Sequence, residues 1–97
     1  MSTISINYNK AYAEANRLKT AANECDTIIS QNQRALADIA SYWEGAAANE
    51  FFAANEKWRK EMQAIKAELT SIGNSIKKVT DDIKEADERA AAAVKNF

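Results

Sequence analysis

The sequence lacks the residues that most often interrupt a helix or cross-link a fold. It contains no proline and only two glycines, Gly45 and Gly73, among 97 residues. Because proline breaks helices and glycine weakens them, long segments are free to form uninterrupted helix. The one cysteine, Cys25, cannot form a disulfide within the chain, so the fold does not depend on covalent cross-links. Cys25 falls at an apolar helical position, where we expect a small buried side chain, with a disulfide to another chain as the alternative.

Histidine is absent as well, which removes the commonest general base and the commonest metal ligand. Adjacent carboxylates occur at Asp81-Asp82 and Asp87-Glu88, but neighbouring side chains on a helix point in different directions. The sequence also has no glycine-rich phosphate loop, no Cys-x-x-Cys pair and no nucleophile motif. We therefore predict that the protein is not an enzyme and has no catalytic, metal or cofactor site.

Charge of one sign is not concentrated anywhere in the chain. The 13 basic and 14 acidic residues are interspersed, whereas nucleic-acid-binding proteins usually carry a basic patch or stripe. The first residues have no basic segment followed by an apolar core, and no apolar run reaches membrane-spanning length. We expect no nucleic-acid partner, no membrane insertion and no cleavable signal peptide.

Apolar residues are nevertheless regularly spaced over the first half of the chain, in alternating steps of three and four that are typical of a packed helix. This predicts a helix over about residues 7–43, for which Ser5, Asn7 and Asn9 are equally suited as N-caps. The expected seam comprises Tyr8, Ala11, Ala15, Leu18, Ala22, Cys25, Ile29, Asn32, Leu36, Ile39 and Trp43. A second column of Ala21, Ile28, Ala35 and Tyr42 widens the apolar stripe, which indicates contact with more than one other helix.

The same spacing predicts a second helix over about residues 47–95. Its expected seam, facing the first helix, comprises Phe51, Asn55, Trp58, Met62, Ile65, Leu69, Ile72, Ile76, Val79, Ile83, Ala86, Ala90, Ala93 and Phe97. Asn32 and Asn55 are polar residues at seam positions. They are either partly exposed or hydrogen-bonded to the local backbone, or they set register or partner choice, as a seam asparagine can.

Between the two segments lies a hinge at residues 43–46. Gly45 can adopt the left-handed conformation without steric cost, so we expect it to end the first helix. Trp43 either fills the bend against Phe51 or Phe52, or exposes its indole for recognition. The predicted fold is all-α, an antiparallel helix-turn-helix hairpin in a single domain. One hairpin leaves the second apolar column uncovered, so we expect two hairpins to form a four-helix bundle, with Ile28, Ala35, Tyr42 and Trp58 at the partner interface.

The segment Trp43-Glu44-Gly45 at the hinge between two helical halves, in a chain of this length, resembles the WXG100 family. Trp58, which follows the hinge, is also similar to family members. The resemblance implies dimers of helical hairpins, either homodimers or heterodimers with a related chain. It also implies export without a cleavable signal peptide by type VII secretion systems of mycobacteria and Gram-positive Firmicutes, with secretion or display at the cell surface. The FtsK/SpoIIIE-type ATPase of the system would be a partner.

Many members of that family carry a C-terminal signal, Tyr-x-x-x-Asp/Glu, which acts together with the Trp-x-Gly hinge. No tyrosine follows Tyr42 in this sequence, and the nearest match is Ile83-x-x-x-Asp87. Either the aliphatic version suffices or a partner chain supplies the signal. Two alternatives remain: an intracellular helical adaptor or heterodimer subunit that escorts a larger toxin for export, and a structural coiled-coil segment of a phage or filament.

Overall fold

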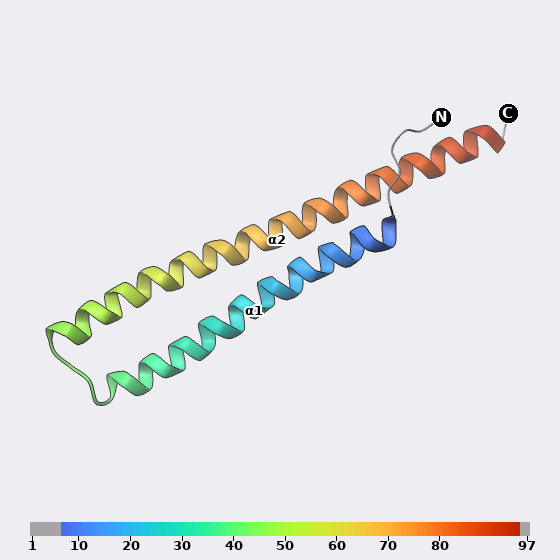
Figure 1. The fold of residues 1–97 in the computed structure, drawn as a ribbon. Coiled ribbons are helices and arrows are strands. Elements are labelled where there is room, and N and C mark those ends of the chain that lie inside the picture. The colour runs from blue at the N-terminus through green and yellow to red at the C-terminus, as the bar shows by residue number, and fades with distance from the viewer. Residues whose placement is uncertain (1–6, 96–97) are drawn as a thin grey trace.

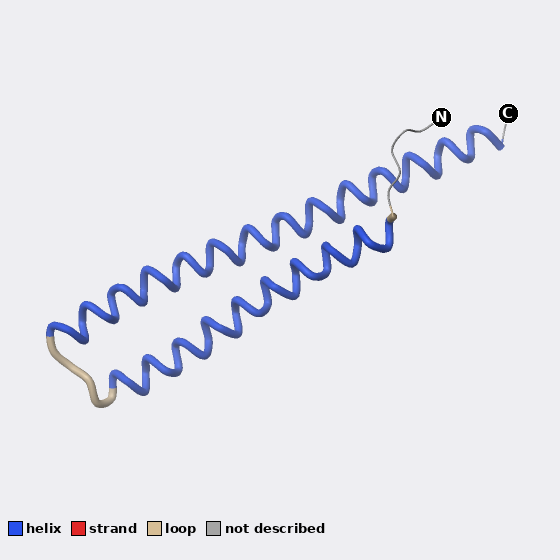
Figure 2. The backbone as a smooth tube through the Cα atoms, in the orientation of Figure 1, coloured by secondary structure: helices blue, strands red, loops and turns tan. Residues whose placement is uncertain are grey.

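The structure, a computed structural model, describes residues 7–95 and contains two helices that form an antiparallel hairpin (Figure 1). Helix α1 spans Tyr8–Ala40 and helix α2 spans Ala46–Lys95. A short turn joins them, and no strand occurs within residues 7–95 (Figure 2). The predicted all-α helix-turn-helix fold is confirmed.

Helix α1 begins at an asparagine N-cap. The backbone of Asn7 is extended, and its side-chain oxygen accepts a hydrogen bond from the backbone N–H of Lys10 at 3.0 Å. This bond satisfies one of the N–H groups that have no partner within the first turn of a helix. Of the candidate N-caps, Asn7 therefore starts the helix, Asn9 lies inside it, and Ser5 lies outside the described residues.

Helix α1 ends at Ala40, before the predicted position 43. The Ser41 hydroxyl donates to the carbonyl of Asp38 at 2.6 Å, and the backbone N–H of Ser41 donates to the same oxygen at 3.1 Å. These bonds tighten the last turn and satisfy a terminal carbonyl, so the chain leaves the helix early. Gly45 has the expected positive φ of 111°, but it immediately precedes α2 and its carbonyl accepts from the N–H of Asn49. Gly45 thus lies immediately before the second helix, and the prediction that it caps the first is wrong, because Ser41 occupies that position.

Most of the fully buried residues between the two helices are small. On α1 the buried side chains are Ala15, Ala22, Cys25 and Ile29, and on α2 the buried residues are Ala48, Gly73 and Thr80. A Cβ atom built on Gly73 would lie 3.2 Å from the carbonyl oxygen of Ala15, so the two backbones approach closely at this point. The absence of a side chain at Gly73 is what permits this spacing.

The seam of α2 differs from the predicted one by a rotation of the helix. The expected seam residues Phe51, Ile65, Ile72 and Val79 have exposed fractions between 41% and 55%. Bulky side chains at these positions would hold α2 away from the alanines of α1, whereas Ala48, Gly73 and Thr80 allow close packing. Phe51, Ile65, Ile72 and Val79 are therefore left on the outside of the hairpin, whereas Trp58, Met62, Leu69 and Ile76 are half-buried.

The hairpin is a thin rod measuring 78 × 16 × 16 Å. Its radius of gyration is 22.3 Å, against about 13 Å for a compact domain of this length. Its accessible surface is 7543 Å², whereas a folded monomer of this mass typically exposes roughly 5,500 Å². Helix α2 continues past the start of α1 at the open end (Figure 1). The isolated hairpin thus exposes about 2,000 Å² more than a compact monomer would.

Candidate functional site

An aromatic cluster occupies the turn. The ring of Trp43 lies 5.4 Å from that of Phe51 and 6.1 Å from that of Phe52, and the two phenylalanine rings are 5.9 Å apart. These tilted and edge-on arrangements are the favourable ones for aromatic pairs. The Trp43 side chain still keeps 38% of its surface exposed, and its neighbour Tyr42 keeps 71%. Trp43 therefore packs in the bend against both phenylalanines, as one prediction had it, and is still partly exposed. A role of the exposed indole in recognition stays a prediction.

The four residues predicted at a partner interface lie in two columns. Ile28 and Ala35 lie seven residues apart on α1, Tyr42 follows seven residues later in the turn, and all three are exposed. Trp58 is half-buried and belongs to a column on α2 with the same spacing. That column comprises Phe51, Trp58, Ile65, Ile72 and Val79.

Helical geometry places these columns on one side of the hairpin. At about 100° per residue, the α1 column is displaced by roughly 100° from the buried line of Ala22 and Ile29. The α2 column is displaced in the same rotational sense from the half-buried line of Met62 and Leu69. Because the two helices run antiparallel, displacements of the same sense bring both columns to the same side. We call these two columns together the apolar face.

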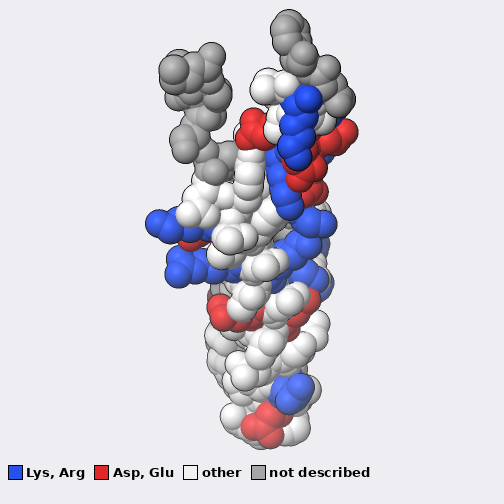
Figure 3. Space-filling model, turned by 90° about the vertical axis from the view of Figure 1, so that its right-hand side faces the viewer, with Lys and Arg blue, Asp and Glu red and all other residues white. Residues whose placement is uncertain are grey.

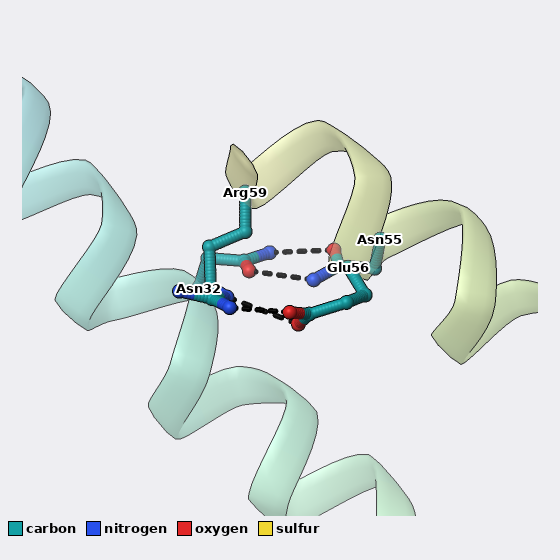
Figure 4. A network of polar contacts seen from close by, with 4 residues as sticks. All are labelled: Asn32, Asn55, Glu56 and Arg59. Atoms are coloured by element: carbon teal, nitrogen blue, oxygen red, sulfur yellow. Dashed lines mark hydrogen bonds and ion pairs between the residues drawn. The ribbon is translucent and has the colours of Figure 1, made fainter. Parts of the chain in front are cut away.

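A pair of amides bridges the helices near the turn. Asn32 on α1 and Asn55 on α2 exchange two hydrogen bonds, of 3.0 and 2.8 Å, between their side chains (Figure 4). Both residues are half-buried, as the partial-exposure prediction had it, and each amide is also satisfied across the seam. A role of the pair in setting register stays a prediction. Beside them, Arg59 and Glu56 form an ion pair (Figure 4), which lowers the pKa of Glu56 and raises that of Arg59.

Two tyrosine–aspartate hydrogen bonds close the open end of the hairpin. Tyr8 donates its hydroxyl hydrogen to Asp87, and Tyr12 donates to Asp81. The bond to Asp87 raises the pKa of Tyr8 to about 12, and the bond to Asp81 raises the pKa of Tyr12. Asp87 is one of the two residues suggested as a C-terminal signal, and the other, Ile83, is half-buried one turn earlier. Sequence reasoning missed both tyrosine contacts, because they depend on the rotation of α2.

Other kinds of site are not found in the described part of the chain. Residues 7–95 contain no group of three or more potential metal ligands placed to hold an ion. Neither helix, over the residues described, is both long and apolar enough to cross a membrane. Lysine, arginine and acidic side chains are mixed on the surface seen in Figure 3, without a continuous patch of either sign. A lysine–aspartate ion pair, Lys66 with Asp26 at 2.7 Å, links the two helices.

Comparison with known proteins agrees with this geometry. Residues 3–88 match the model of a family described as WXG100, proteins of 100 residues with WXG. The chain is 27% identical over 82 residues to the ESAT-6-like protein EsxT of Mycobacterium tuberculosis, covering 84% of this chain and 82% of that protein. It is 20% identical over 93 residues to the ESAT-6-like protein EsxA of Corynebacterium diphtheriae, covering 96% and 98% of the two chains.

Solved structures share the fold. EsxA of Geobacillus thermodenitrificans superposes with a TM-score of 0.83 at 13% identity, over 92% of this chain and 99% of that one. EsxB of Bacillus anthracis, described as a secreted protein, superposes with a TM-score of 0.79 at 23% identity, over 90% and 99%. The family match covers most of the chain and includes the segment Trp43-Glu44-Gly45 at the observed turn. The chain is therefore a member of the WXG100 family of ESAT-6-like proteins.

Proposed function

We propose that this chain is a small substrate or export partner of a type VII secretion system, which acts through protein–protein contacts as one half of a four-helix bundle. Family membership supports the link to secretion, and the relative EsxB of Bacillus anthracis is itself described as secreted. The single observation that carries the binding role is the apolar face, which no other part of the described hairpin covers.

The size of the uncovered surface fits this role. The hairpin exposes about 2,000 Å² more than a compact monomer of its mass, and a standard protein interface buries about 800 Å² on each partner. A second hairpin laid on the apolar face would remove Ile65, Ile72 and Val79 from water. The benefit is roughly 25 cal/mol for each Å² of apolar surface buried.

A second copy of the chain can cover the whole α2 column. Ile65 is the central residue of that column, with Phe51 and Trp58 toward the turn and Ile72 and Val79 toward the open end. A two-fold axis through Ile65, perpendicular to the helices, places Phe51 opposite Val79 and Trp58 opposite Ile72. Each large side chain then meets a smaller one, as core packing favours. We therefore expect the isolated chain to form an antiparallel homodimer, and a heterodimer with a related chain would use the same face.

This arrangement also supports a composite export signal. In an antiparallel dimer, the turn of one hairpin lies beside the open end of the other, so Trp43 of one copy approaches Ile83 and Asp87 of the second. The signal of the family has a tyrosine where this chain has Ile83, and here a phenol reaches Asp87 from Tyr8 on the other helix. We expect the ATPase of the secretion system to bind this combined surface.

Oligomeric state tests the binding role. Sedimentation equilibrium at micromolar concentration should give the mass of a dimer, and Ile65→Asp should shift it to monomer, because two carboxylates would then meet at the two-fold axis. Val94→Asp is the matched control, since Val94 is also an exposed apolar residue but lies at the open end, past the start of α1. A folded monomer for the unaltered chain would contradict the dimer.

Export tests the role in secretion. The chain should appear in the culture supernatant when the secretion ATPase is present and be retained when the ATPase gene is deleted. Trp43→Ala should block export while the dimer stays folded, and Glu44→Ala, at the variable position of the motif, should be exported normally. Retention of the unaltered chain in the cell, bound to a larger protein, would instead favour the adaptor function.

A further inference from the structure

The outer edge of the apolar face on α2 is acidic at its centre. Glu61 and Glu68 lie four residues before and three residues after Ile65, so they flank it on the helix surface. The opposite flank, three before and four after, is formed by Met62 and Leu69, which are half-buried toward α1. Both glutamates are exposed, and neither forms an ion pair within residues 7–95.

These glutamates face like charges when the partner is a second copy of the chain. This step rests on the bundle of two hairpins proposed above. The two-fold axis through Ile65 that pairs the large and small apolar residues also brings Glu61 opposite Glu68 of the second copy, and Glu68 opposite its Glu61. Like charges at such flanking positions weaken association.

We propose that Glu61 and Glu68 determine which partner is preferred. They bias the apolar face away from a second copy and toward a different helical hairpin that carries lysine or arginine opposite them. The apolar column provides most of the attraction for either partner, because hydrophobic burial is not selective between hairpins. The two carboxylates add selectivity, since specificity commonly depends on a repulsive contact with the wrong partner. A homodimer then forms when the chain is alone and exchanges when a basic-edged partner is present.

Charge reversal tests this inference with the chain itself as the probe. In the Glu68→Lys homodimer, two Glu–Lys contacts would replace two Glu–Glu contacts. The dissociation constant of the dimer should therefore fall roughly fivefold to tenfold at low ionic strength. The difference should shrink in 0.5 M salt, at which exposed charges are screened within about 4–5 Å. Glu88→Lys makes the same charge change on another side of α2 and should leave the dissociation constant unchanged. Glutamate and lysine are both good helix formers, so each variant should fold.

A mixing experiment gives the second readout. The double variant E61K/E68K should self-associate as weakly as the unaltered chain, because Lys–Lys contacts replace Glu–Glu contacts. When the unaltered chain and the double variant carry different fluorescent labels and are mixed in equal amounts, energy transfer should show that well over half of the dimers are mixed. Random pairing would give one half. Statistical mixing, with dimers still present, would overturn the selectivity and leave the proposed dimer intact. Absence of any dimer in every mixture would instead refute the bundle on which both depend.

Discussion

Removing one member of the Asn32–Asn55 pair should cost more than removing both. In the Asn32→Leu variant, the Asn55 amide keeps its place at the seam but loses both hydrogen bonds to Asn32. An unsatisfied buried polar group costs about 1–3 kcal/mol. Because the two residues are only half-buried, water can reach the stranded amide in part, and we expect a loss of stability of about 1 kcal/mol.

The double variant N32L/N55L should recover that loss. Two leucines at the seam leave no polar group without a partner, and each buries apolar surface worth up to roughly 1.5–3 kcal/mol when fully covered. We therefore expect the double variant to be at least as stable as the unaltered chain, although with weaker selection of register, since the directional amide contact is gone.

Urea and thermal unfolding, followed by circular dichroism at one fixed protein concentration, measure these effects. For a domain of this size, 1 kcal/mol corresponds to a shift of roughly 4–8 °C in Tm. Asn16→Leu is the control, because Asn16 is an exposed asparagine on α1, and its replacement should change stability by less than about 0.5 kcal/mol. If Asn32→Leu costs no more than Asn16→Leu, or if the two single changes add without coupling, the amide pair has no structural role.

Three further perturbations follow from other contacts. Gly73→Leu should destabilise the hairpin by about 1–3 kcal/mol in chemical denaturation, because the leucine side chain would displace α1. Gly73→Ala should stay near the stability of the unaltered chain, because its gain in helix propensity is offset by the tight contact of the new Cβ with the Ala15 carbonyl oxygen at 3.2 Å. The hydrogen bond to Asp87 raises the Tyr8 pKa from 10.0 to about 12. The contribution of this bond to stability is complete below pH 10 and is lost as the pH rises toward 12, so the unfolding midpoint of Tyr8→Phe should depend less on pH in that window than the midpoint of the unaltered chain. Midpoints with the same pH dependence in both proteins would contradict the bond. Lys66→Ala should reduce stability by less than about 1 kcal/mol, and increasingly less as salt is added, because the pair with Asp26 is exposed.

Much of the fold could be predicted from residue spacing. The regular apolar steps and the lack of proline indicate two long helices, and the position of Gly45 indicates the turn between them. The rotation of α2 could not be predicted, because bulk alone favours burying Phe51, Ile65, Ile72 and Val79. Burial inside the hairpin is decided by fit to the partner surface, and the alanines of α1 accept Gly73 and Thr80 instead.

The rotation of α2 also explains which features of the candidate site could be predicted from the sequence. The exposed column on α1 was expected because it lies beside a complete seam, and the aromatic turn because Trp43 and Phe51 are close in sequence. The contacts of Tyr8 with Asp87 and of Tyr12 with Asp81 join residues 79 and 69 positions apart. Their pairing requires both the register and the rotation of the helices, and spacing within one helix contains neither.

The rod shape has a consequence for the export proposed above. At 78 Å long and 16 Å across, the hairpin can pass lengthwise through an opening that admits two helices side by side, each about 10 Å in diameter. Stacking a second hairpin on the apolar face thickens one short dimension and leaves the long one nearly unchanged. A conduit for the folded pair would need a cross-section of about two helices by two, provided that the particle enters end first.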